Sequence, residues 1–99
     1  MRARGYARGV ITPSLTLIGK PDCHLCEEVR AVVTQVVAGL AAEGVPVAVE
    51  ERSILDDPDL SVRWHDDIPV VLIGTALHDR WRVDADRLRA DLLAAADLG

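Results

Sequence analysis

The chain contains two cysteines, Cys23 and Cys26, and two residues stand between them. A Cys-x-x-Cys pair is used in four kinds of site: half of a zinc site, a haem attachment, a structural disulfide and a redox-active dithiol. A haem attachment requires a His directly after the second cysteine, where this chain has Glu27. A structural zinc site needs four ligands, usually two such pairs, and the three histidines stand singly at no paired spacing. The sequence therefore predicts neither a haem nor a metal site.

Length and composition narrow the remaining choices. The 99 residues correspond to one domain, which is long enough to bury roughly two thirds of the surface of the unfolded chain. The formal net charge of −5 argues against a nucleic-acid partner, which a basic surface would bind. No run of about 18 apolar residues is present, and the N-terminus lacks the apolar segment of a signal peptide. We therefore expect a cytoplasmic protein with no membrane contact, and permanent disulfides are rare in that compartment.

The pattern of apolar and turn residues predicts the elements that position the cysteines, in the order β-α-β-α-β-β-α. The strands are expected at residues 14–20, 45–51, 68–73 and 76–82. The helices are expected from Cys23 to a stop at Gly44 and Pro46, from 58 to 65, and from 85 to about 95. Asp57 and Asp84 are the expected N-caps of the second and third helices.

These elements predict an α/β fold with a four-stranded mixed sheet and three helices. A strand, a helix and a second strand imply a parallel pair with a right-handed connection, and the last two strands are expected to form an antiparallel hairpin. Residues 14–99 then form a single domain. Residues 1–13 are expected to be a loose N-terminal tail, because they show no periodicity. The Cys-x-x-Cys lies at the junction between the first strand and the first helix.

The position of the cysteines favours redox chemistry. Cys23 lies at a helix N-terminus, where free N–H groups and the helix dipole favour a thiolate. Cys26 falls on the apolar stripe of the helix, so we expect it to be less exposed. The acidic Asp22, Glu27 and Glu28 oppose this effect, so the sequence predicts a Cys23 pKa only modestly below that of a free cysteine. Two buried cysteines that act as small apolar side chains remain an alternative.

Three stretches, "LTLIGKPDCHLC", "DDPDLSVRWHDDIPVVLIG" and "WRVDADRLRADL", resemble the short glutaredoxin-like proteins of the thioredoxin-fold superfamily. The resemblance covers roughly residues 14–95. It implies a thioredoxin-like fold of the glutaredoxin type and a thiol–disulfide oxidoreductase. In such an enzyme Cys23 is the nucleophile and Cys26 is the resolving thiol.

The resemblance also implies substrate-binding roles. Lys20 matches a basic residue that helps to hold the carboxylate of glutathione, and a protonated His24 would favour the thiolate. Pro69 matches a cis proline that turns the backbone of Ile68 outward, where it pairs with an extended substrate. Asp84 matches an acidic contact to the γ-glutamyl end of glutathione. Each residue also has an ordinary structural role as an alternative: a solvated charge, an exposed imidazole, a trans proline at a strand start and a helix cap.

The chain departs from the glutaredoxin pattern at two places. His24 and Leu25 stand where glutaredoxins with glutathione chemistry usually carry Pro-Tyr. Arg82 and Val83 stand where those proteins place a Gly-Gly pair, and their side chains are expected to obstruct the glutathione groove. These departures affect glutathione binding and leave dithiol exchange intact.

The sequence therefore predicts a monomeric enzyme that needs no bound organic cofactor. It would reduce disulfide-bearing proteins or glutathione mixed disulfides, and glutathione or a flavoprotein reductase would return it to the dithiol. A non-catalytic thioredoxin-fold binding or adaptor module is the alternative, with Ile68, Pro69 and Cys23 as its contact surface. A third hypothesis is a dimer in which one Cys23 from each subunit and glutathione hold an iron–sulfur cluster.

Overall fold

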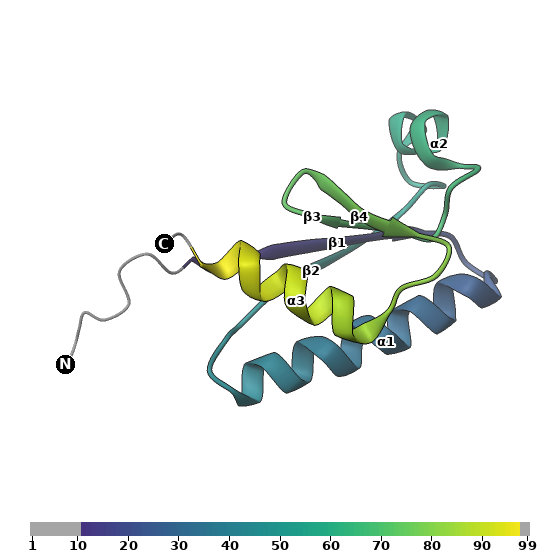
Figure 1. The fold of residues 1–99 in the computed structure, drawn as a ribbon. Coiled ribbons are helices and arrows are strands. Elements are labelled where there is room, and N and C mark those ends of the chain that lie inside the picture. Colours follow the sequence, from purple (N-terminus) through teal and green to yellow (C-terminus); the bar gives the residue numbers. More distant parts are fainter. Residues whose placement is uncertain (1–10, 98–99) are drawn as a thin grey trace.

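The fold matches the predicted order of elements. The computed structural model describes residues 11–97, which form a four-stranded mixed sheet with three helices (Figure 1). The strands are β1 (Ser14–Gly19), β2 (Ala48–Ser53), β3 (Val70–Ile73) and β4 (Ala76–Arg80). The helices are α1 (His24–Ala42), α2 (Pro58–Trp64) and α3 (Ala85–Ala96). Residues 1–10 of the predicted tail lie outside the described part of the chain. Ile11 and Pro13 at the end of that stretch make backbone hydrogen bonds to Ala96 and Ala48.

The sheet has the strand order β2-β1-β3-β4. β1 pairs in parallel with β2 and antiparallel with β3, and β3 pairs antiparallel with β4. The parallel pair and the closing hairpin are therefore confirmed. Helices α1 and α3 lie together on one face of this sheet, whereas α2 lies at the opposite side near the ends of β2 and β3 (Figure 1).

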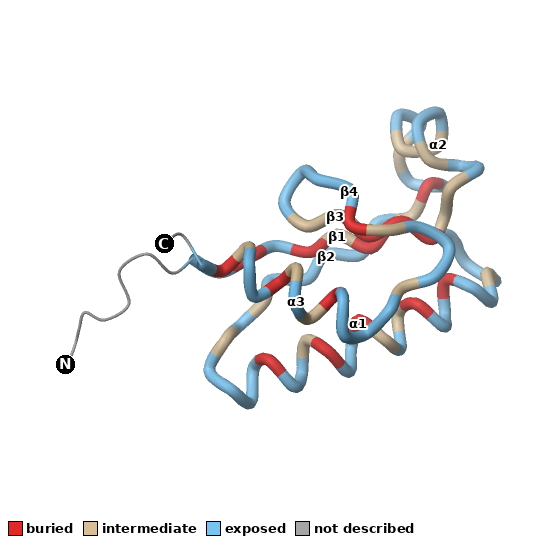
Figure 2. The backbone as a smooth tube through the Cα atoms, viewed as in Figure 1, coloured by how far each residue is buried: buried red, intermediate tan, exposed pale blue. Residues whose placement is uncertain are grey.

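Two apolar clusters hold these layers together, and the alternation of side chains along β1 divides them. Leu15 and Leu17 pack in the larger cluster with α1, β3 and α3. Ile18 points to the other face, in a smaller cluster that includes Trp64 of α2. The buried stripe of α1 recurs at three- and four-residue spacing, as predicted (Figure 2). Its members are Cys26, Val29, Val33, Val36 and Leu40. The position of Cys26 on this stripe joins the cysteine pair to the buried side of the helix.

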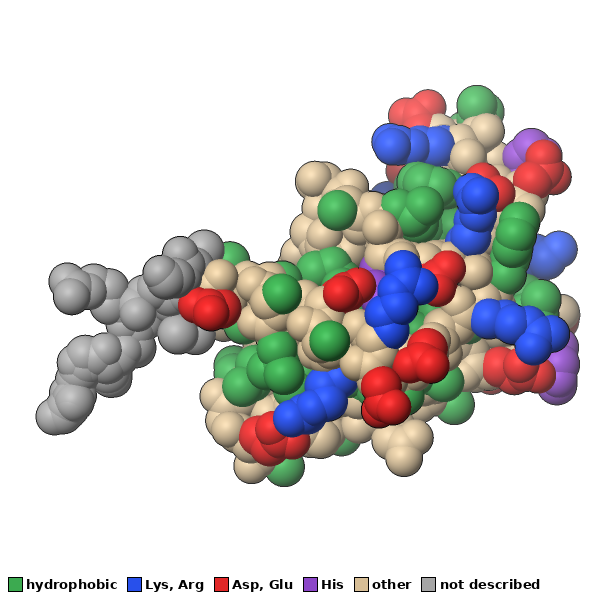
Figure 3. Space-filling model, viewed as in Figure 1, with side chains coloured by type: hydrophobic (Ala, Val, Ile, Leu, Met, Phe, Trp, Pro, Cys, Tyr) green, Lys and Arg blue, Asp and Glu red, His purple; other side chains and the backbone are tan. Residues whose placement is uncertain are grey.

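The outer surface of α3 carries acidic and basic side chains side by side (Figure 3). One ion pair joins α3 to the C-terminal end of α1: the Arg89 guanidinium donates a hydrogen bond to the Glu43 carboxylate. This hydrogen bond lowers the pKa of Glu43 and raises that of Arg89. Exposed pairs of this kind contribute little to stability, so the apolar clusters dominate the packing of the two helices.

The prediction for the second strand was wrong by two to three residues at each boundary. Residues 45–51 were expected, and β2 instead covers Ala48–Ser53. The Val45 N–H is bound to the Leu40 carbonyl at the end of α1, and Pro46 has no N–H to donate to a ladder. Val45 and Val47 pack against the larger core cluster from this loop. Their apolar pattern therefore reflects packing of a loop, whereas β2 itself is a polar and mostly exposed edge strand.

The third and fourth strands are shorter than predicted. β3 begins at Val70 rather than Ile68, because Pro69 lacks an N–H for the ladder. β4 ends at Arg80 rather than Arg82, because Trp81 adopts a positive φ of 68° and turns the chain away from the sheet. The start of β3 and the end of β4 lie at the same end of the sheet as Gly19, the last residue of β1 before the cysteine pair.

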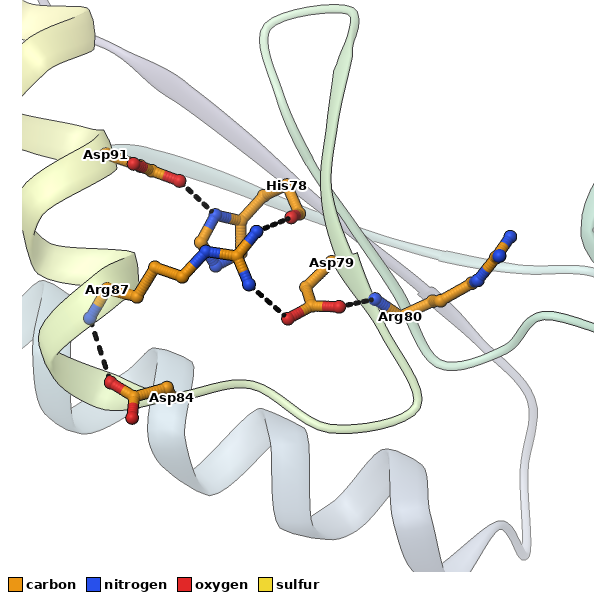
Figure 4. A network of polar contacts seen from close by, with 6 residues as sticks. All are labelled: His78, Asp79, Arg80, Asp84, Arg87 and Asp91. Atoms are coloured by element: carbon orange, nitrogen blue, oxygen red, sulfur yellow. Dashed lines mark hydrogen bonds and ion pairs between the residues drawn. The ribbon is translucent and has the colours of Figure 1, made fainter.

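A polar network joins β4 to α3 (Figure 4). His78 is 6% exposed, and its Nδ1 lies 2.7 Å from the Oδ2 of Asp91, which accepts the hydrogen bond. The Arg87 guanidinium donates to the carbonyl of His78 and to the Asp79 carboxylate. The Nε2 of His78 is buried and has no partner among the described residues. The stability of this buried imidazole therefore depends on Asp91.

Asp91→Ala is expected to lower the free energy of unfolding by about 1–2 kcal/mol, since it leaves a buried polar ring without its partner. Asp91 is about half exposed (47% for its side chain), which places the loss toward the lower end of that range. Asp91→Asn is the matched control, because its amide oxygen still accepts a hydrogen bond from a neutral imidazole. Urea unfolding measures both variants. Equal stability of Asp91→Ala and wild type would contradict the assigned role.

Candidate functional site

Cys23 and Cys26 lie at the first turn of α1 and form a disulfide in this structure. Their Cα atoms are 5.2 Å apart, which is within the range that a disulfide spans without backbone movement. Cys23 is the N-cap residue of the helix, and its backbone is extended rather than helical. The predicted placement of the pair at the start of the first helix is therefore confirmed.

The two sulfur atoms have different environments. Cys23 is partly exposed, whereas Cys26 is only 2% exposed. The backbone N–H of Cys26 donates to the Cys23 sulfur over 3.2 Å, as expected for the capping atom of a helix. A negative charge on Cys23 is stabilised by this N–H and by the helix dipole, whereas burial of Cys26 disfavours a charge on its sulfur. The geometry thus provides an outer sulfur suited to attack and an inner sulfur suited to closure.

Gly19, the last residue of β1, lies directly against Cys26. A Cβ atom built on Gly19 would be 2.9 Å from the Cys26 sulfur and 3.3 Å from its Cβ. The first distance is shorter than real Cβ contacts allow, so only glycine leaves room for the Cys26 side chain. In the sequence, Gly19 falls within the first expected strand, residues 14–20, and no contact with a cysteine was predicted for it. A glycine inside a strand that leads into a cysteine loop is a signal for such a close approach.

The ends of the four strands bring a row of residues together beside the cysteines. Gly19 pairs with Ser53 on one side, and the register that joins Ile18 to Val70 places Pro69 opposite Gly19 on the other side. Trp81 continues the row, because its N–H donates to the Pro69 carbonyl over 2.8 Å. The row Ser53, Gly19, Pro69 and Trp81 therefore runs across the sheet, with Gly19 against Cys26 and Trp81 at the start of the loop to α3.

The Ile68–Pro69 peptide bond is cis, as the family resemblance implies. Pro69 is buried, and Ile68 is partly buried. Within residues 11–97 the backbone N–H and C=O of Ile68 make no hydrogen bond. This edge therefore leaves one donor and one acceptor unpaired, and its pairing with an extended substrate remains a prediction.

A hollow of about 250 Å³ lies on the β2 side of Cys26, and Lys20 lines it. Lys20 is exposed and has no polar partner within the described part of the chain. On the same hollow the Arg30 guanidinium bridges Glu27 and Glu51 at 3.0 and 2.9 Å. Hydrogen bonds to Glu51 and then to Glu27 raise the pKa of Arg30. Lys20 is thus the cation of this hollow that remains available to an anionic group.

His24 and two of the three acidic residues near Cys23 contact other side chains. The Nε2 of His24 lies 2.9 Å from the Glu28 carboxylate, and the His24 side chain is 87% exposed. Glu27 is paired with Arg30. His24, Glu27 and Glu28, which were expected to favour or oppose a Cys23 thiolate, therefore each have a side-chain partner of their own. Asp22 is the exception, since it makes no ion pair with another described residue and adopts a positive φ of 58°.

Asp84 caps α3, as predicted. Its carboxylate accepts a hydrogen bond from the Arg87 N–H over 2.9 Å. The second carboxylate oxygen makes no hydrogen bond to another described residue. The contact to a substrate that the resemblance implies for Asp84 remains a prediction.

The sequence family follows from comparison with known proteins. A family model described as "Glutaredoxin-like domain (DUF836)" matches residues 14–93. The chain belongs to this family. The match includes every helix and strand except the last turn of α3, and it contains both cysteines, Gly19, Pro69 and Trp81.

Sequence relatives and solved structures match this glutaredoxin-like chain over most of their own length. The X-ray structure of XcR50 from X. campestris is 34% identical, with a TM-score of 0.63, and the alignment covers 82% of this chain and 97% of that one. The uncharacterized protein Rv0508 from Mycobacterium tuberculosis is 29% identical over 81% of this chain and 82% of its own length. Chloroplastic thioredoxin z is 16% identical, with a TM-score of 0.64 over 90% of this chain and 80% of its own. At that identity the likeness shows the thioredoxin-type fold alone.

Two further observations concern other kinds of site. Between residues 11 and 97, no three His, Cys, Asp or Glu side chains gather in an arrangement that would hold a metal ion. The helices of the described region include none with the length and apolar character needed to cross a membrane.

Proposed function

We propose that this glutaredoxin-like protein is a thiol–disulfide oxidoreductase that reduces protein disulfides or glutathione mixed disulfides. The observation that carries the proposal is the asymmetric pair. Cys23 caps a helix and is partly exposed, and Cys26 is buried against Gly19 within bridging distance. A pair that served only as small apolar side chains would not need one sulfur at the surface of a helix N-terminus.

Reduction proceeds by two exchanges. The Cys23 thiolate attacks one sulfur of the target disulfide, a new S–S bond forms, and the other target sulfur leaves as a thiolate and takes up a proton. The Cys26 thiol then loses its proton and attacks the Cys23 sulfur, which releases the second target thiolate. The target gains two electrons and two protons, and the protein is left with the Cys23–Cys26 disulfide seen in this structure.

The protein returns to the dithiol through an external reductant. Two glutathione molecules supply the two electrons and leave as glutathione disulfide, or a flavoprotein reductase supplies both electrons. The protein's own residues need no bound organic cofactor for these exchanges. The proposal includes the reducing cytoplasm as the compartment and a monomer as the working unit.

The surroundings of the pair support binding of an extended substrate. The unpaired N–H and C=O of Ile68 form an open edge directly before Pro69, the residue that lies opposite Gly19 in the sheet. Such an edge pairs with the backbone of an extended segment and holds its disulfide next to the cysteines. Lys20, which borders the hollow beside Cys26, is placed to contact a carboxylate of glutathione or of a peptide.

Donor preference tests this proposal directly. Wild-type protein is incubated with an intermolecular peptide disulfide and either glutathione with its reductase or a thioredoxin reductase, and NADPH oxidation is followed. We expect turnover with at least one donor system, above the rate of the donor alone. Absence of turnover with both systems, in protein whose dithiol is shown to be intact, would rule out the oxidoreductase.

The unpaired Ile68 edge also favours a second candidate, a non-catalytic binding module. Such a module would bind an extended segment without using its thiols. In that case a variant with both cysteines changed to serine would bind its partner as well as wild type does, while the donor experiment shows no turnover.

A further inference from the structure

Trp81 has a backbone conformation that is rare for a residue with a side chain. Its φ is 68°, in the left-handed region where L side chains are seldom found. The Arg82 N–H donates to the Arg80 carbonyl over 2.8 Å, so Trp81 is the central residue of a tight three-residue turn. Turns of this kind persist only where the surrounding contacts hold them, and such positions cluster at functional sites.

Three contacts hold Trp81 in this turn. Its N–H donates to the Pro69 carbonyl over 2.8 Å, and its indole N–H donates to the Asp66 carbonyl over 3.4 Å. The Arg80 guanidinium lies 4.9 Å from the centre of a Trp81 ring. The first two contacts bind Trp81 to the loop that carries the unpaired Ile68 edge. Even so, Trp81 remains 47% exposed.

The exposed ring borders a hollow on the side of α1 that follows the cysteines. The hollow has a volume of about 230 Å³ and lies between α1 and the loop from β4 to α3, which Figure 1 shows beside the helix. Val29 and Val32 of α1 and Trp81 and Val83 of the loop supply its apolar walls. Val29 lies three residues after Cys26 on the same buried stripe of α1. The hollow therefore adjoins the helix face that carries Cys26.

We propose that Trp81 is a specificity-determining residue that selects disulfides in peptides with an apolar side chain close to the cysteine, in preference to glutathione. This inference rests on the proposed function of the same site. A segment paired with the Ile68 edge directs alternate side chains to opposite sides. Trp81 lies beside this edge, since its N–H is bound to the Pro69 carbonyl and its indole N–H to the Asp66 carbonyl, so a side chain on that side of the segment would meet the exposed ring. Glutathione carries two carboxylates and no apolar side chain, so it leaves the indole and the valines in contact with water.

Two charged side chains complete the hollow, and the preference for a peptide over glutathione rests on its apolar walls. Glu28 and Arg82 also line it, and Glu28 is already paired with His24. The Arg82 side chain has no hydrogen bond or ion pair within residues 11–97. The hollow therefore combines an apolar floor with one available cation, which suits a peptide with an apolar residue and an acidic neighbour.

The test separates binding from turnover. Two peptides that differ only in Leu or Ser two residues after a cysteine, and reduced glutathione, are titrated against the full chain with Cys23→Ser and Cys26→Ser. We expect the Leu peptide to bind about tenfold more tightly than the Ser peptide. Trp81→Gly is expected to abolish this difference and to leave glutathione binding unchanged within about twofold. Glycine adopts the required φ freely, so this variant is expected to fold.

Two control variants sharpen the result. Trp81→Phe keeps an aromatic ring and is expected to retain most of the preference for the Leu peptide. Leu77→Ala removes an apolar side chain of similar exposure, 46%, from β4, the strand that precedes Trp81, and is expected to change nothing. Equal binding of the two peptides to the Trp81-containing protein, or a preference that survives Trp81→Gly, would overturn the inference. Turnover is measured separately in the protein with both cysteines, so its absence would refute the oxidoreductase and leave the role of Trp81 decided by binding.

Discussion

Cys23→Ser is expected to lower the rate of disulfide reduction roughly a thousandfold or more, because a serine hydroxyl is a far poorer nucleophile than a thiolate at neutral pH. Cys26→Ser is expected to behave differently. It retains the attacking sulfur and loses the one that closes the internal bridge, so it stops after the first exchange. Turnover of a peptide disulfide with glutathione as donor measures the first effect, and mass spectrometry of a trapped mixed disulfide measures the second.

The structure supports this order of events rather than the reverse. Cys23 is the partly exposed sulfur and accepts the Cys26 N–H over 3.2 Å, whereas Cys26 is 2% exposed and packs against Gly19. A target disulfide therefore reaches Cys23 first. His24→Gln is the matched control, since His24 is 87% exposed and paired with Glu28. We expect that variant to keep its rate within about twofold.

A Cys23→Ser variant that reduces disulfides at the wild-type rate would rule out the oxidoreductase mechanism. A mixed disulfide that accumulates on Cys26 in Cys23→Ser, rather than on Cys23 in Cys26→Ser, would reverse the two roles.

Much of the fold was predictable because its signals are local. The period of the apolar stripe on α1 and the Asp57 and Asp84 caps each act within a few residues. The placement of the cysteines follows from the same signals, since a strand that ends at Gly19 and a helix that begins at His24 leave little room for another arrangement.

The errors in the strand boundaries arose where contacts with distant parts of the chain decide where a strand begins or ends. β2 begins at Ala48 because that residue is the partner of Ser14 in the parallel ladder, and the Val45–Val47 pattern serves packing against the core. The contacts of the candidate site are of the same kind. The pairing of Glu28 with His24 follows from helical spacing, but the contact of Gly19 with Cys26 and the hydrogen bond from Trp81 to Pro69 depend on sheet register. Residue spacing along one segment does not contain that information.

Gly19→Ala is expected to destabilise the disulfide form by about 1–3 kcal/mol, the usual cost of forcing an extra carbon atom into a packed interior. The new Cβ would lie 2.9 Å from the Cys26 sulfur. In the dithiol form the Cys26 side chain is not tied to Cys23 and moves away more easily, so the cost is expected to be smaller. A difference of about 1.4 kcal/mol between the two forms would raise the reduction potential by about 30 mV. Urea unfolding of both forms and a redox titration against glutathione measure these effects.

A double-mutant cycle attributes the effect to Cys26. In the Cys26→Ala background the sulfur is absent and only the 3.3 Å contact with the Cβ of residue 26 remains, so Gly19→Ala is expected to cost less than about 1 kcal/mol. Gly39→Ala on α1 is the matched control, because its new Cβ would meet no atom within 4 Å and alanine favours a helix. The contrary result is that Gly19→Ala lowers the free energy of unfolding equally in both backgrounds and leaves the reduction potential of the two-cysteine protein unchanged. That result would mean that β1 requires this glycine for its own backbone. A coupling between the two sites would show that the end of β1 positions the resolving cysteine.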